Sequence, residues 1–162
     1  MNTTLSIYFE KNLTGSEITK FLENLFPSLV FFNWDFSGDK PEGFDSTKNT
    51  HINYTYDFNK EVFEFQYYIT IWRVPEVDSQ ERTLYVGRQL HQFIESRVLV
   101  PYTRKENEID PYWNIVFDNN KTYLVEDFNS HWGGFEDKNA LKVDREIDLE
   151  IPNFNKTAEK VI

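Results

Sequence analysis

Three histidines are the first candidates for metal binding or acid–base catalysis, at His51, His91 and His131. A site of either kind needs two histidines brought together with a carboxylate. No HxH, HxxxH or HxxE spacing occurs, and no internal repeat accompanies their even distribution. We therefore expect histidines that lie on the surface or cap backbone groups, and we predict no metal and no cofactor.

Carboxylates offer a second route to chemistry. The pairs Glu126-Asp127 and Glu136-Asp137 flank a turn at 131–134 with the sequence HWGG. A glycosidase or a nuclease needs two acids held at a fixed separation in a cleft, and no pattern here marks such a cleft. The two glycines lack the lysine and the strand–loop–helix context of a phosphate-binding loop. Solvated surface acids are the favoured interpretation, and the chain is not predicted to be an enzyme.

Clear strand and helix patterns begin the chain. Apolar residues alternate with polar ones at 5–10, which predicts a strand. Thr14 and Glu17 have the spacing of a capping box, and the apolar helical face that follows is stopped by Pro27. The segment 29–36 is rich in Phe, Val and Trp, which predicts a strand buried on both faces.

The middle of the chain predicts a loop and two strands. Turn-forming residues at 37–50 predict a surface loop. Alternation at 51–58 predicts a strand with one face in water, a second candidate binding surface that Glu64 and Gln66 extend. A two-residue turn at 59–60 then leads into a long strand at 62–74.

A second helix and further strands follow. Ser79 is the expected N-cap of a helix that Pro101 bounds, and Gly87 within it indicates close packing. Alternation on both sides of two asparagines predicts a hairpin at 113–126. The pattern at 147–151 indicates a short edge strand.

These elements predict an α+β protein, a mainly antiparallel sheet of about six to seven strands with two helices on one face. The predicted order is β-α-β-β-β-α-β-β, with the last short strand in addition. We expect one domain over residues 1–152, and a C-terminal tail at 153–162 that frays.

Composition excludes several classes of protein. The 162 residues include no cysteine, so disulfides, thiolate metal sites and a cysteine nucleophile are absent. Aromatic residues make up 17% of the chain, which argues against disorder. A net charge of −10 disfavours binding to nucleic acid, because phosphates would be repelled. Apolar runs are far shorter than the roughly 20 residues that span a membrane, and no signal-peptide pattern occurs at the start, so we expect a cytoplasmic location.

The distribution of charge carries the functional prediction. Residues 101–162 contain 13 acidic and 8 basic residues, which is half of the net charge, and aromatic residues accompany them. Acidic surfaces with aromatic anchors suit a basic protein partner, because charge accelerates encounter and aromatics contribute binding energy. The residues that we expect to contact this partner are Asp110, Tyr112, Asp118, Glu126, Asp127, Trp132, Glu136 and Asp137.

The chain resembles the bacterial immunity proteins of contact-dependent inhibition and other polymorphic toxin systems. The resemblance rests on size, charge, a texture rich in Asn, Lys, Ile and Phe, and the aromatic-acidic segments 112–114 and 131–137. It implies a cytoplasmic single-domain protein that neutralises one basic toxin, often a nuclease, in a 1:1 complex.

Two other classes of function stay open. An enzyme or a small-ligand-binding domain would contain a concave pocket lined by aromatics with a few convergent polar groups. A structural protein, such as one from a mobile element, would form a homo-oligomer through a sheet edge or an apolar face.

Overall fold

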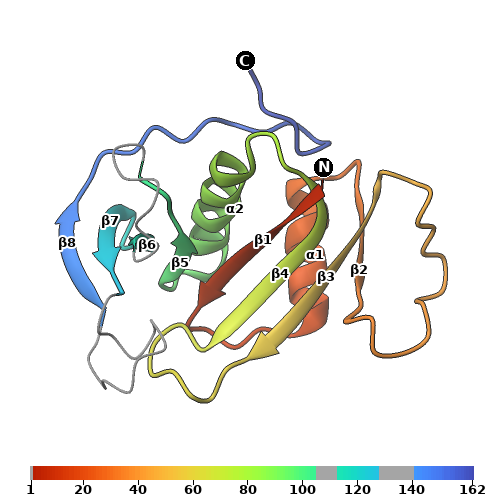
Figure 1. The fold of residues 1–162 in the computed structure, drawn as a ribbon, viewed down its shortest axis with the longest axis horizontal. Helices are drawn as coiled ribbons and strands as arrows, with labels where there is room; N and C mark the ends of the chain where they lie inside the picture. Colours follow the sequence, from red (N-terminus) through yellow and green to blue (C-terminus); the bar gives the residue numbers. More distant parts are fainter. Residues whose placement is uncertain (1, 105–112, 128–140) are drawn as a thin grey trace.

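The computed structural model describes residues 2–104, 113–127 and 141–162. Within these residues the chain forms two helices and eight strands, and the predicted α+β class is confirmed (Figure 1). The helices are α1 (Gly15–Leu25) and α2 (Ser79–Ile94). The strands are β1 (Asn2–Phe9), β2 (Val30–Asn33), β3 (His51–Phe58), β4 (Tyr67–Pro75), β5 (Val98–Pro101), β6 (Trp113–Asp118), β7 (Lys121–Glu126) and β8 (Lys142–Glu146).

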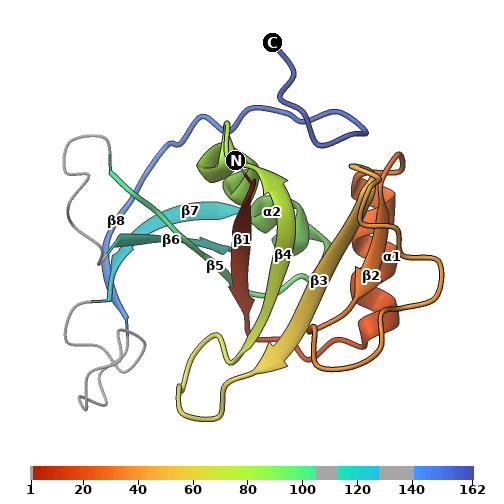
Figure 2. The same ribbon diagram turned by 45° about the vertical axis from the view of Figure 1, so that its right-hand side comes forward.

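All eight strands join one sheet in the order β2-β3-β4-β1-β5-β6-β7-β8. The β2–β3 pair is parallel and every other pair is antiparallel. The sheet curves, so that β6, β7 and β8 turn away from the plane of β1, β3 and β4 (Figure 2). The first strand therefore lies in the middle of the sheet and connects its two halves.

Helix α1 begins where the sequence predicts it to begin. The Thr14 hydroxyl accepts a hydrogen bond from the Glu17 backbone N–H at 3.1 Å, and the Glu17 carboxylate accepts one from the Thr14 N–H at 2.7 Å. This reciprocal pair satisfies two backbone donors that the helix itself leaves free. The predicted capping box is confirmed.

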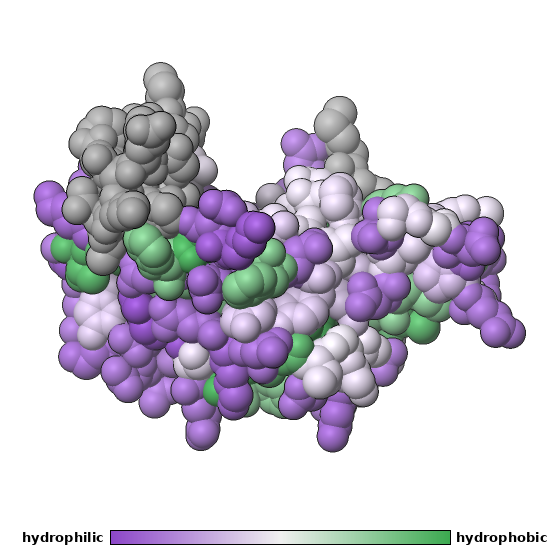
Figure 3. All heavy atoms as spheres, turned by 90° about the horizontal axis from the view of Figure 1, so that it is seen from below, coloured by the Kyte–Doolittle hydropathy of each residue, from purple (hydrophilic) through white to green (hydrophobic). Residues whose placement is uncertain are grey.

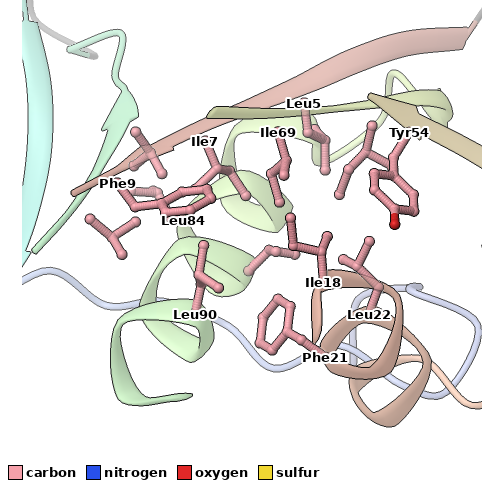
Figure 4. Close-up of a cluster of buried hydrophobic side chains, with 14 of the residues drawn as sticks. Leu5, Ile7, Phe9, Ile18, Phe21, Leu22, Tyr54, Ile69, Leu84 and Leu90 are labelled. Carbon is pink, nitrogen blue, oxygen red and sulfur yellow. The ribbon is translucent and has the colours of Figure 1, made fainter. Parts of the chain in front are cut away.

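Both helices pack on the same face of the sheet. Side chains from β1, β3 and β4 point toward the helices, and the Phe21 and Phe93 rings join α1 to α2 with their centroids 5.3 Å apart (Figure 4). Most of the buried apolar side chains in the described residues gather in this one cluster. Figure 4 labels Leu5, Ile7, Phe9, Ile18, Phe21, Leu22, Tyr54, Ile69, Leu84 and Leu90.

The prediction missed β5, which lies between β1 and β6. The sequence predicted that the second helix continues through these residues. Instead α2 ends at Ile94, and Glu95 follows in the left-handed conformation. Close packing at Gly87 is confirmed, because a Cβ atom there would lie 2.6 Å from Cγ1 of Val100 on β5. The predicted N-cap at Ser79 is wrong, since the cap position is Asp78 and no side chain bonds to the helix there.

Two predicted strands are shorter than expected. β2 is an edge strand with Val30 42% exposed, because the sheet ends there and leaves one of its sides without a neighbour. β4 begins only at Tyr67, and residues 59–66 form a longer connection whose Phe65 is fully buried on the face opposite the helices. The predicted two-residue turn is therefore wrong.

The face of β3 that was expected to lie in water is partly covered. His51 is 9% exposed and Asn53 is fully buried. Aromatic side chains from β2, residues 34–36, the 37–50 loop and β4 lie close together beside this strand, because the loop folds back over the sheet instead of extending into solvent. These side chains are Phe32, Trp34, Phe36, Phe44 and Trp72.

The C-terminal segment differs from its prediction. The last strand is β8, and the expected strand at 147–151 does not form. Residues 153–162 do not fray: Phe154 is 7% exposed, and the Ser28 N–H bonds to the Lys156 carbonyl at 3.2 Å. The segment crosses the upper end of the molecule from β8 past α2 toward α1, because its apolar side chains add to the core (Figure 1).

Neither described helix has the length and apolar character that crossing a membrane would require.

Candidate functional site

Three of the eight predicted partner-contacting residues lie in the described part of the chain: Asp118, Glu126 and Asp127. The other five fall outside the described residues; they are Asp110, Tyr112, Trp132, Glu136 and Asp137.

The structure separates Asp118 from the other two. Asp118 pairs with Lys121 at one end of the β6–β7 hairpin, and Glu126 pairs with Trp113 at the other end. Two strand ends five residues apart are separated by about 17 Å. The described acids of the predicted surface therefore belong to two different ends of the sheet.

At the Trp113 end, Asp127 is 8% exposed and accepts a hydrogen bond from the Asn114 side-chain amide at 2.8 Å. Glu126 is partly exposed and lies between Trp113 and Lys142 in the strand register. Asp127 thus has a structural contact inside the protein, and Glu126 is the described acid that this end presents to solvent.

At the opposite end, three carboxylates converge on one guanidinium. Arg97 Nη1 lies 3.1 Å from Glu10 Oε1 and 3.2 Å from Glu64 Oε1, and Arg97 Nε lies 4.0 Å from Asp118 Oδ2. We call these four residues the Arg97 cluster. With all four ionised, its net charge is two units negative.

Strand pairing explains how this cluster forms. Phe9 pairs with Val98, and Val98 pairs with Phe117. The next residues outward on the three strands are Glu10, Arg97 and Asp118, so they meet at one edge of the sheet. The fourth member, Glu64, comes from the connection between β3 and β4.

Burial sets the electrostatics of the cluster. The side chains of Glu10, Glu64 and Arg97 are 23–32% exposed, so water screens their charges only in part. Burial raises the pKa of the Glu10 carboxyl above its ordinary value; the Arg97 charge opposes this rise, and the charges of Glu64 and Asp118 add to it. The guanidinium carbon also lies 4.8 Å from the centroid of the Phe65 ring, which helps to fix its position.

A notch of about 260 Å³ lies beside the cluster, between the end of α2 and the β6–β7 turn. Asp118 and Glu95 line it. Its wall is held by His91, which accepts a hydrogen bond from the Asn120 N–H through Nε2 at 3.2 Å and contacts the Ser96 carbonyl through Nδ1 at 2.7 Å. Since Nε2 accepts, the proton of the neutral ring lies on Nδ1.

Both described histidines have structural partners. His91 bonds to backbone groups on two sides, and His51 Nδ1 accepts a hydrogen bond from the Asp45 N–H at 3.0 Å. His131 falls outside the described residues. In the part of the chain that the structure describes, no group of three or more His, Asp or Glu side chains has the arrangement of a metal site.

Strand β8 forms one edge of the sheet, and all five of its residues are exposed. Its acids pair with nearby bases: Glu146 with Lys121 at 2.9 Å, and Asp144 with Arg145 at 3.0 Å. An edge strand with this many charges resists pairing with a second copy of itself.

The end of the sheet where β1 stops and β5 begins faces the viewer in Figure 3. Its visible surface is mostly hydrophilic, and apolar side chains appear only in small, separate patches (Figure 3). Such a surface suits recognition through charge more than recognition through a broad apolar contact.

Sequence reasoning identified Asp118, assigned Glu64 to a different candidate surface on the face of β3, and missed Glu10 and Arg97. Glu10, Glu64 and Arg97 come from separate parts of the sequence, and none stands in a motif. The alternation that predicted β1 placed Glu10 at its end, but only the position of β5 beside β1 brings Arg97 to it.

No family model, no curated protein and no solved structure matches this chain.

Proposed function

We propose that this chain is a cytoplasmic inhibitor of the immunity-protein class, which binds one basic toxin domain in a 1:1 complex and blocks it. The observation that carries the proposal is the charge excess of the Arg97 cluster beside the notch at Asp118 and Glu95. In this proposal the notch receives a lysine or arginine side chain of the toxin.

The electrostatic argument has two parts. A chain with a net charge of −10 attracts a basic domain over a distance comparable with the Debye length, which accelerates encounter. At contact, a cation entering the notch meets the carboxylates of Glu95 and Asp118, and Arg97 approaches the second of these only to 4.0 Å. That cation therefore loses less on leaving water than it would at a neutral surface.

The second acidic region is the end of the sheet with Trp113 and Glu126. At this end the three strands pair side by side, with Trp113 of β6 opposite Glu126 of β7 and Glu126 opposite Lys142 of β8. The predicted residues Asp110, Tyr112, Trp132, Glu136 and Asp137 stay part of the proposed partner surface on the sequence argument.

Homo-oligomerisation through the sheet edge is less well supported. The exposed strand β8 carries two acids and two bases among its five residues, which disfavours a β-edge contact between copies.

The proposal is tested with the protein encoded by the gene adjacent to this one. Its C-terminal domain is expressed and titrated with this chain in a calorimeter at several salt concentrations. We expect a 1:1 complex whose dissociation constant rises with salt, and restored growth when both proteins are expressed together. The absence of a complex, or a complex insensitive to salt, would contradict the proposal.

Charge reversal then identifies the surface. One variant combines Asp118→Lys with Glu95→Lys, and a second combines Glu126→Lys, Glu136→Lys and Asp137→Lys. The control is Asp39→Lys, an exposed acid in the loop before β3. We expect the first variant and the second to bind more weakly than the control, which loses long-range attraction alone. Binding equal to that of the control would remove the notch from the interface in the first case, and Glu126, Glu136 and Asp137 in the second.

A further inference from the structure

A cavity of about 420 Å³ opens at the other end of the strands, on the helix-covered side of the sheet. It lies where the end of α1, the start of α2 and the C-terminal segment meet. Its volume falls in the range of about 300–1,000 Å³ that is typical of small-molecule sites. The buried apolar side chains that line it include Leu5, Phe26, Phe31, Ile52, Ile71 and Val74.

One wall of this cavity contains a buried arginine. Arg82 is 4% exposed; its Nε donates to the Ala158 carbonyl at 2.8 Å, and its Nη1 donates to the Pro75 carbonyl at 3.0 Å. Its Nη2 has no hydrogen-bond partner among the described residues. The Phe154 ring, whose centroid lies 5.2 Å from the guanidinium carbon, holds the side chain from another side.

A second arginine lines the same cavity. Arg73 donates to the carbonyls of His51 and Ser46 at 3.1 and 2.7 Å. Its backbone φ is +64°, a conformation that costs a residue other than glycine about 1 kcal/mol or more. A β-bulge explains this conformation: Ile71 and Val74 of β4, three residues apart, pair with Leu5 and Thr3 of β1, which are two residues apart. This bulge brings Arg73 to the cavity.

Neither guanidinium forms an ion pair with a carboxylate in the described part of the chain. The nearby acids have other partners. Lys160 Nζ lies 3.6 Å from Asp78 and 2.7 Å from Glu81. Glu159, which also lines the cavity, accepts hydrogen bonds from the side chains of Asn155 and Thr157. Asp78 attracts the Arg82 charge from a greater distance, but in the described part of the chain no carboxylate lies within ion-pairing distance of the two positive charges beside this apolar space.

We propose that this cavity binds a small amphipathic carboxylate, with the apolar body against the sheet and the carboxylate on Arg82 and Arg73. A guanidinium with a free N–H recognises a carboxylate well, because both groups are charged and planar. The remaining apolar lining would favour an alkyl or aryl body. The presence of Glu159 at the cavity favours a ligand with a single negative charge. This proposal is independent of the proposed inhibitor function.

The test compares ligands that share one alkyl chain. Octanoate, 1-octanol and octylammonium are titrated separately into the whole protein by calorimetry, and amide shifts are followed by NMR. We expect octanoate to bind 1:1 at least tenfold more tightly than the other two, with shifts at Val74, Arg82 and Ala158. Because the protein is acidic overall, a non-specific surface effect would favour octylammonium instead.

Variants test the two arginines. Arg82→Gln and Arg73→Gln should each weaken octanoate binding at least tenfold, while Arg88→Gln, a matched change on the same helix away from the cavity, should leave it unchanged. If Arg82→Gln fails to fold, Arg73→Gln and the ligand comparison still decide. No octanoate binding, equal binding of octanol, or amide shifts confined to other parts of the molecule would overturn the proposal.

Discussion

At one end of the sheet, Glu10, Glu64 and Asp118 share the single guanidinium of Arg97; at the other end, Arg73 and Arg82 line a cavity with no described carboxylate in ion-pairing distance. Helix α2 runs between these regions, with Arg82 in its first turn and Arg97 just beyond its end. The comparison shows that a net charge of −10 conceals local charge of both signs.

The two regions also differ in how their charges are held. Each guanidinium of the cavity donates to two backbone carbonyls, which cannot change protonation state. The Arg97 cluster depends on carboxylates, so its charge changes with pH. The predictions that follow separate the two regions through stability, and they run from the largest expected effect to the smallest.

Replacing Arg82 by Met should have the largest effect. The variant loses two charge-assisted hydrogen bonds to carbonyls, a buried one to Ala158 and a partly buried one to Pro75, so we expect the free energy of unfolding to fall by about 3 kcal/mol. Urea denaturation measures this loss, and hydrogen exchange should show faster opening of residues 155–161. Arg88→Met is the control. Equal losses of unfolding free energy in both variants would show that the hydrogen bonds from Arg82 to the two carbonyls do not stabilise the fold.

Replacing Arg97 by Gln should have the next largest effect. Three carboxylates then face one another without a cation, and because the site is only partly exposed we expect a loss of about 2 kcal/mol at pH 7. The loss should shrink in acid, where the carboxylates are protonated. Arg145→Gln, which removes an ion pair whose arginine side chain is 57% exposed, should cost far less. A loss for Arg97→Gln that does not depend on pH would contradict the electrostatic explanation.

Replacing Gly87 by Ala tests the helix that links the two regions. Alanine favours a helix interior by about 1 kcal/mol over glycine, but its Cβ would overlap Val100 Cγ1 at 2.6 Å. We expect the clash to win, with a net loss of about 1 kcal/mol. Adding Val100→Ala should make the effect of Gly87→Ala less unfavourable in a double-mutant cycle. Additive effects would show that the two side chains do not meet.

Replacing Glu10 by Gln should have the smallest effect, visible as a change of pH dependence. The pKa of Glu10 is raised in the folded state, so between its ordinary value and the raised value the folded protein binds more protons than the unfolded chain. Stability then falls as pH rises through that window. We expect the stability of the wild type relative to Glu10→Gln to decrease over this range. The opposite slope would mean that attraction to Arg97 outweighs burial.

Local patterns predicted those parts of the fold whose cause is local. The capping box at Thr14, the hairpin around Asn119 and Asn120, and the close approach at Gly87 each follow from neighbouring residues, and the structure confirms them. Strand β5 was missed because a short apolar run fits either a helix or a strand, and only its position between β1 and β6 decides.

The C-terminal segment is a second case that local patterns could not predict. Phe154 and Ala158 look unremarkable in a polar tail, yet they are buried because Arg82 and the end of α1 provide partners far away in sequence. The bulge that presents Arg73 likewise depends on the pairing of β4 with β1. The composition predicted an acidic protein and included Asp118 in its acidic C-terminal region, whereas the charge excess of the Arg97 cluster could be found only from the register of three strands.

The most direct test of the proposed function is the affinity of the candidate toxin domain, the C-terminal domain of the adjacent gene's product, for Asp118→Lys compared with Asp39→Lys. Both changes add two positive charges, so both alter long-range attraction equally, and only Asp118 lies in the Arg97 cluster and its notch. We predict that Asp118→Lys weakens binding at least tenfold beyond Asp39→Lys, at constant salt and with both variants folded. Equal affinities of the two variants would contradict the assignment of the acidic end as the partner surface.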